Sequence, residues 1–135
     1  MWRACAALFY AGALLASGCS AVAPDSGVQG TVTAGPFCPV ERADQPCPDR
    51  PAQVHLQAIR FPPGFVGVPA PQSGRVVARF ASGADGRFRV ALPPGEYLLY
   101  GDPRATGFVA GCRASADVPP HRWLQINVGC DTGIR

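Results

Sequence analysis

Residues 85–99 read Asp-Gly-Arg-Phe-Arg-Val-Ala-Leu-Pro-Pro-Gly-Glu-Tyr-Leu-Leu, and this stretch decides the fold. Apolar side chains alternate with polar or small ones on both sides of the Pro-Pro-Gly corner, which is the pattern of half-buried strands. Gly86 supplies a turn conformation, and the rigid corner separates one strand from the next. We predict strands over residues 86–92 and 96–100, with these inward side chains: Phe88, Val90, Leu92, Tyr97 and Leu99.

The same alternation recurs along the rest of the chain. It predicts five further strands, over residues 27–33, 53–60, 75–81, 110–118 and 123–130. The turn-forming cluster at residues 82–86 predicts a hairpin between the strands that flank it. Inward side chains expected from the first three of these strands are Val28, Gly30, Val32, Val54, Leu56, Ala58, Val76, Ala78 and Phe80. Seven short strands without a helical segment predict an all-β fold, an antiparallel seven-stranded β-sandwich.

Composition agrees with short strands and many turns. The 135 residues include 15 prolines and 16 glycines, well above the usual combined share of about 12%. Residues 27–135 suffice for one folded domain and are too few for two good cores. The formal net charge of +3 is too small to indicate nucleic-acid binding.

The N-terminus has the pattern of an export signal. An apolar run over residues 4–16 follows Arg3 and is too short to span a membrane, which takes about 20 residues. The run leads into Leu15-Ala-Ser-Gly-Cys19, which resembles the lipobox of bacterial lipoproteins, where the cysteine is acylated before the signal is cut. We therefore expect a cleaved signal peptide over residues 1–18, a lipidated tether over residues 19–26 and a membrane-anchored location in the cell envelope.

Two alternatives to the lipid anchor stay open. The chain can be an ordinary secreted protein cut after Ala16 or Ala21, or the segment can remain as an uncleaved anchor. Ser20 stands where many inner-membrane lipoproteins of Gram-negative bacteria have aspartate. The resemblance therefore implies the outer membrane, where the host has one.

Four cysteines remain once Cys5 leaves with the signal and Cys19 is acylated. An even number of thiols in an exported chain predicts disulfides, and four thiols permit three pairings. If the last two strands pair antiparallel about His121, small or apolar residues face one another on one side of the sheet. The opposed pairs are Val118 and Leu124, Ala116 and Ile126, Ala114 and Val128, and Cys112 and Cys130. Strand parity therefore predicts a Cys112 to Cys130 bridge, which leaves Cys38 to pair with Cys47.

The stretch over residues 85–99 resembles the D-G-x-F-x-x-x-L-P-P-G-x-Y-x-L signature of carboxypeptidase regulatory-like domains, which have a transthyretin-like (prealbumin-like) β-sandwich. Residues 27–32 resemble the first strand of that family, and the similarity spans residues 27–130. The ending over residues 130–135 and the Gly-Pro-x-Cys-Pro-Val loop are similar to a bacterial subgroup of these proteins. The resemblance implies an accessory, structural or ligand-contacting module without enzymatic activity.

Four arginines form the first candidate site. In the predicted hairpin they lie on its outer face, where guanidinium groups would bind the phosphate or carboxylate of an anionic ligand. The alternative is a solvated face neutralised by Asp85, Glu96 or Asp102. The candidate anionic-ligand contacts are Arg75, Arg79, Arg87 and Arg89.

An apolar loop over residues 61–74 is the second candidate site. Exposed, it would mark a contact with another protein; folded back, it would cover a sheet edge. Trp123 is ambiguous in the same way. The candidate partner contacts are Phe61, Phe65, Val66 and Val68.

Catalytic and metal chemistry find little support. Asp131-Thr132-Gly133 matches the tripeptide of aspartic proteases, but only two residues follow it. His55 and His121 lack metal-ligand spacing, and no serine lies in a nucleophile elbow. We expect no catalytic residue, metal or cofactor, and a monomer that binds no nucleic acid. The expected function is that of a non-enzymatic lipid-anchored envelope module with a structural or protein-interaction role; the alternative is a module that binds a small molecule, an anionic glycan or a phospholipid head group.

Overall fold

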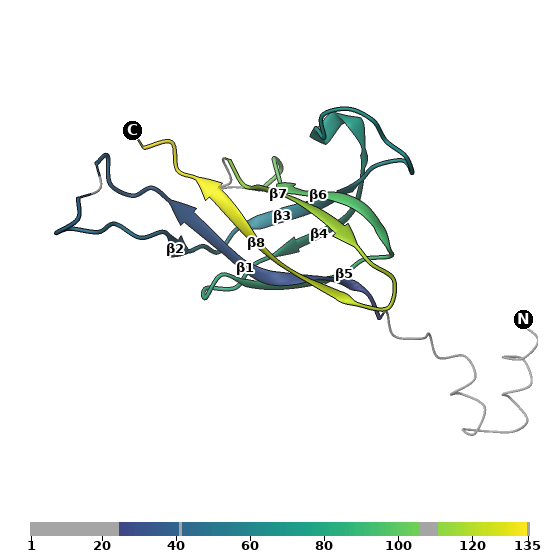
Figure 1. Cartoon of the computed structure of the whole chain (residues 1–135), viewed down its shortest axis with the longest axis horizontal. Helices are drawn as coiled ribbons and strands as arrows, with labels where there is room; N and C mark the ends of the chain where they lie inside the picture. Colours follow the sequence, from purple (N-terminus) through teal and green to yellow (C-terminus); the bar gives the residue numbers. More distant parts are fainter. Residues whose placement is uncertain (1–24, 41, 106–110, 135) are drawn as a thin grey trace, which may run out of the picture.

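The protein has an all-β fold (Figure 1). The computed structural model describes residues 25–40, 42–105 and 111–134, and within these ranges the only helical element is the 3-10 turn η2 (Pro71–Ser73). The same ranges contain no helix long and apolar enough to cross a bilayer. The strands are β1 (Gly27–Gly35), β2 (Arg50–Pro51), β3 (His55–Arg60), β4 (Arg75–Ala81), β5 (Arg87–Ala91), β6 (Gly95–Gly101), β7 (Arg113–Val118) and β8 (Trp123–Asp131).

All seven expected strands are present, with bounds that differ by a few residues at most. The short strand β2 is an addition, at the end of the proline-rich segment that follows β1. Some predictions concern residues outside the described ranges: the signal peptide over residues 1–18, Cys5, the acylation site Cys19, most of the tether, and residue 110 at the start of the sixth expected strand.

A single mixed sheet curls over on itself to make a two-layered sandwich (Figure 1). One layer, here the β1 layer, contains β1 with β8 on one side and both β2 and β5 on the other. The second layer, here the β6 layer, has the order β7, β6, β3, β4. The ladder between β7 and β8 is confined to Arg113 opposite Gly129, because β7 is paired along its length with β6 and β8 is paired along its length with β1. The two layers are therefore hydrogen-bonded to each other at one corner.

The core between the layers consists of side chains that the alternation placed inward. Val28, Val32, Leu56, Ala58 and Leu99 are fully buried. Tyr97 is 2% exposed, and its hydroxyl donates a hydrogen bond to the carbonyl of Pro93 at 2.6 Å, so the Pro-Pro-Gly corner provides the partner that a buried tyrosine needs.

The expectation of a purely antiparallel sandwich is wrong for one pair of strands. β1 and β8 run parallel over nine residue pairs, from Gly27 opposite Trp123 to Gly35 opposite Asp131. They are the first and last strands, and the whole domain connects them, so no tight turn fixes their relative direction. Direction here is set by the closure of the sandwich, which local alternation does not reveal.

The predicted hairpin at residues 82–86 is also wrong. β4 pairs with β3 and β5 pairs with β1, so this segment crosses from one layer to the other. Ser82 marks the crossing point: its buried hydroxyl donates to the Ala52 carbonyl at 2.6 Å and accepts the Val54 amide at 2.9 Å. Phe80 and Phe88 do meet, with ring centroids 5.5 Å apart, but they do so across the core and not side by side on one sheet.

A β-bulge corrects the predicted orientation of Val76. The register of β3 against β4 changes from Ala58 opposite Ala78 to Ile59 opposite Val76, which leaves Val77 as the extra residue. The extra residue reverses the inward and outward faces between the two sides of the bulge. Val76, on the N-terminal side of the bulge, therefore packs outside the core, against the cluster of Ile59, Phe61 and Leu98. The uninterrupted run Val76-Val77-Ala78 was the visible break in alternation.

Both predicted disulfides are confirmed. Cys38 is bonded to Cys47, and Cys112 to Cys130. The one paired position of β7 and β8, Arg113 with Gly129, has the register that placed the second bridge. The other opposed pairs predicted for these strands are absent from this ladder, because the strands belong to different layers.

Candidate functional site

The outer face of the β1 layer is lined with polar side chains. Since β1 sends Val28 and Val32 into the core, its intervening residues face outward, and the neighbouring strands behave likewise. The strand register aligns these outward residues in rows across β5, β1 and β8. The rows are Arg87, Thr31 and Asn127; Arg89, Gln29 and Gln125; and Ala91, Gly27 and Trp123. We call the surface formed by Gln29, Thr31, Arg87, Arg89, Trp123, Gln125 and Asn127 the polar face.

Two neighbours hold Arg89 in place on the polar face. Its guanidinium carbon lies 3.7 Å from the ring centroid of Trp123, and its Nη1 donates a hydrogen bond to Oε1 of Gln29 at 2.9 Å. An exposed cation–π contact contributes about 0.5–1 kcal/mol. A guanidinium has five N–H donors in a planar fork, so this head is oriented and still has donors for a carboxylate or phosphate.

A shallow hollow of about 410 Å³ lies beside Arg87, lined by residues of β1, β5 and β8 that include Gln29, Thr31 and Gln125. Arg87 makes an exposed ion pair with Asp85, at 3.7 Å between Nε and Oδ2. The two side chains are 81% and 64% exposed, so solvent screens the pair and Arg87 can exchange Asp85 for an anionic ligand at little cost. Thr31 Oγ1 donates to Asn127 Oδ1 at 2.9 Å across the two strands.

The structure does not bring the four predicted arginines together. Arg87 and Arg89 share the polar face, whereas Arg75 and Arg79 belong to β4 in the other layer. Arg79 pairs with Asp102, at 3.5 Å between Nε and Oδ2. The four-arginine cluster depended on the predicted hairpin, and it divides because the chain crosses between layers at that point.

The apolar loop divides in a similar way. Phe61 is 5% exposed and stacks on Phe65 with centroids 5.0 Å apart, over the cluster on the outer face of the β6 layer. Val66 and Val68 are 92% and 84% exposed. The base of the loop therefore covers a sheet face, where a sheet edge was expected, and its tip projects into solvent.

No sequence pattern predicted the apolar hollow of about 430 Å³ at the end of the sandwich where β1 and β8 terminate. Its lining includes Phe37 from the proline-rich segment and Ile134 after β8. Both residues lie outside the alternating strands, so alternation does not predict that they meet. Trp123, Gln125 and Asn127 were likewise missed as companions of Arg89, because only the parallel pairing of β1 with β8 aligns them.

The Asp131-Thr132-Gly133 tripeptide has a structural role in this fold. Asp131 Oδ1 accepts the Gly133 amide at 2.8 Å, which closes a local turn. The Thr132 amide donates to the Gly35 carbonyl at 3.0 Å, and its hydroxyl donates to the carbonyl of Pro36. The tripeptide thus fastens the end of β8 to the end of β1. Among the described residues, no group of three or more His, Cys, Asp or Glu side chains has the arrangement of a metal site.

His121 and Asp25 form an exposed pair where the chain enters the sandwich. His121 lies in the turn between β7 and β8 with a φ of 57°, and its Nδ1 is 2.5 Å from Oδ2 of Asp25. The hydrogen bond to Asp25, and then its negative charge, raise the pKa of His121. The same hydrogen bond lowers the pKa of Asp25 below its usual value.

We expect an NMR titration to give His121 a midpoint above the ordinary value of about 6.5. Asp25→Asn should return the midpoint toward that value, because it removes the charge that favours the imidazolium. The His121 contribution to stability is present below about pH 6.5 and disappears as pH rises through the raised pKa. The Asp25 contribution is present above about pH 4 and disappears as pH falls through the lowered pKa. An Asp25→Asn variant with an unchanged His121 midpoint would contradict this pairing.

Comparisons with known proteins show no family for this chain. No family model and no curated protein matches the chain. Among solved structures, the N-terminal domain of shaft pilin spaA from Lactobacillus rhamnosus GG is similar, with 15% sequence identity and a TM-score of 0.49. The alignment covers 81% of this chain and 97% of the pilin domain. The all-β sandwich is shown by the structure itself, and membership of the carboxypeptidase regulatory-like family is not shown.

Proposed function

We propose that the protein is a non-enzymatic, lipid-anchored module of the cell envelope that binds an anionic glycan through the polar face. The observation that carries this proposal is the fixed Arg89 head, held by Trp123 and Gln29 in the middle of a surface of amide, hydroxyl and guanidinium groups. Side chains of these types hydrogen-bond sugar hydroxyls, and a planar guanidinium binds a sugar carboxylate with two parallel bonds.

The lipid anchor is the second element of the proposal. It is supported by the small residues and cysteine at Ala16-Ser-Gly-Cys19, directly after an apolar run. Two disulfides in the folded part agree with an oxidising compartment. Acylation of Cys19 would attach the sandwich to a membrane, the outer membrane where the host has one. Incorporation of a clickable fatty acid into the mature protein tests it, and an unlabelled protein would leave ordinary secretion as the explanation.

The binding proposal predicts a loss that is confined to one layer. We expect Arg87→Gln/Arg89→Gln to weaken binding of hexagalacturonate at least about tenfold, because hydrogen bonds to charged groups are each worth about 1.5–3 kcal/mol. Calorimetric titration at low salt measures the affinity. Neutral maltohexaose, which has no carboxylate, should not discriminate between the wild type and this variant.

Arg75→Gln/Arg79→Gln is the matched control, since it removes the same charge from the β6 layer. It should bind hexagalacturonate like the wild type. Equal losses in the two double variants would indicate a response to net charge and would reject a specific face. A wild type that binds no acidic oligosaccharide would favour the second candidate, a structural or protein-interaction role through the exposed Val66 and Val68.

A further inference from the structure

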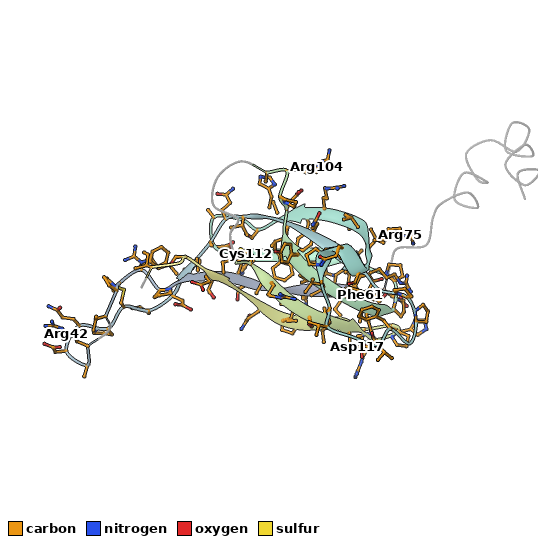
Figure 2. The ribbon with its side chains drawn as sticks, turned by 90° about the horizontal axis from the view of Figure 1, so that it is seen from above. Arg42, Phe61, Arg75, Arg104, Cys112 and Asp117 are labelled. Atoms are coloured by element: carbon orange, nitrogen blue, oxygen red, sulfur yellow. A yellow bond between two sulfur atoms is a disulfide. The ribbon has the colours of Figure 1, made fainter. Side chains whose placement is uncertain are left out.

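The apolar loop is attached at the end of the sandwich where the chain enters. Ser26 Oγ donates to the Leu92 carbonyl at 2.7 Å, just before the Pro-Pro-Gly corner. Phe61, the first residue of the loop, donates its amide to the Glu96 carbonyl at 3.2 Å, just after that corner. Figure 2 shows Phe61 near this end, with Arg42 at the opposite end of the molecule. The start of the folded part and the root of the loop therefore lie on either side of one corner.

The two exposed valines stand on a fixed base. Phe61 and Phe65 stack on each other and pack against the outer face of the β6 layer. Further along, Arg113 Nη2 donates to the Pro69 carbonyl at 2.8 Å, which holds the returning part of the loop to β7. Val66 and Val68 lie between these two attachments and are 92% and 84% exposed. Together they present a small exposed apolar surface at this end of the sandwich.

We propose that Val66 and Val68 enter the interfacial region of the lipid bilayer to which the chain is anchored. This inference rests on the proposed acylation of Cys19. Asp25 is the sixth residue after Cys19, and an extended chain covers at most about 3.6 Å per residue, so the start of the folded part lies within about 22 Å of the acylated cysteine. Short tethering keeps this end at a high local concentration next to the membrane, where even two small apolar side chains are enough to set an orientation.

Charge at this end does not select an anionic membrane. Basic and acidic groups are both present, and they nearly balance: Arg60, Arg75, His121 and Arg122 against Asp25, Glu96 and Asp117. The contact is therefore expected to be apolar and to survive in neutral phosphatidylcholine and at high salt. It leaves the polar face, on the opposite layer, available to a glycan.

The experiment uses the full chain, processed in its host, purified with its lipid and reconstituted into phosphatidylcholine vesicles. A fluorescent probe of polarity is attached at Val68→Cys, and in a separate sample at Val40→Cys. Val40 is 70% exposed, and it lies within the Cys38–Cys47 loop at the far end of the sandwich, so it is the matched control. We expect the probe at position 68 to shift to the blue and to lose most of its fluorescence to spin-labelled lipid, while the probe at position 40 does neither.

Each other outcome overturns the inference. If the protein floats with the vesicles but the probe at position 68 stays in water, the lipid anchor is supported and insertion of the loop into the bilayer is rejected. If the protein does not float, the lipid anchor fails, and the loop proposal fails with it. If the probe is buried without vesicles and its signal depends on protein concentration, the loop covers a second copy of the chain.

Discussion

Gly30→Ala is expected to lower the free energy of unfolding by about 3 kcal/mol or more, which corresponds to a fall of roughly 12 °C in Tm for a domain of this size. A Cβ at position 30 would lie 1.7 Å from the carbonyl oxygen of Ile126 and 2.8 Å from its carbonyl carbon. Both atoms belong to the backbone of β8, and no change of rotamer relieves the overlap. The only relief is separation of β1 from β8, which breaks the parallel ladder. Thermal unfolding followed by circular dichroism measures the change.

Gly129→Ala is the control for that variant. Gly129 lies in the same ladder, opposite Thr33, and a Cβ there would meet nothing within 4 Å. We expect its stability to equal that of the wild type or to rise by up to about 1 kcal/mol, because alanine restricts the unfolded chain more than glycine does. Similar Tm values for the two glycine variants would show that contact with Ile126 does not limit position 30.

Cys112→Ala/Cys130→Ala carries the second large effect. The bridge joins residues 18 apart, and loop closure of that length contributes about 3 kcal/mol in the chain-entropy model. Cys112 and Cys130 are 1% and 4% exposed, so the substitution also removes packed sulfur from the core. The bridge lies beside Arg113 and Gly129, the residue pair through which β7 and β8 join the two layers in the described part of the chain. We expect a fall in Tm of roughly 12 °C or more.

Cys38→Ala/Cys47→Ala makes the matched comparison. That bridge closes a loop at the end of the molecule, where opening is a local event that leaves the core folded. We therefore expect a smaller change in Tm and a new protease cleavage between residues 39 and 46. If this pair costs as much global stability as the buried pair, the loop contributes to the core more than its exposure indicates.

Alternation predicted the parts of the fold that depend on one strand at a time. It gave β4 with its observed bounds and most of the inward side chains, and strand parity gave both disulfides. The errors concern which strand pairs with which. The hydroxyl of Ser82 is held by Ala52 and Val54, far away in the sequence, and this contact turns an expected hairpin into a crossing between layers.

The candidate site shows the same limit. Arg87 and Arg89 were found because they occupy the outward positions of one strand. Trp123 lies beside them only because β8 pairs with β1, and Arg79 lies away from them because β4 belongs to the other layer. The two-residue alternation along a strand predicts which of its side chains share a face. A surface made of three strands also depends on the order of those strands in the sheet, which alternation does not specify.

The parallel pairing of the first and last strands also affects how the protein responds to tension. The chain enters β1 at Gly27 and leaves β8 at Asp131, at opposite ends of a shared ladder. Pulling on the two termini therefore slides the strands along each other and strains all their evenly spaced hydrogen bonds together, where a hairpin would unzip one bond at a time. Under tension applied at these two ends, the sandwich is therefore expected to resist unfolding more than one whose first and last strands form a hairpin.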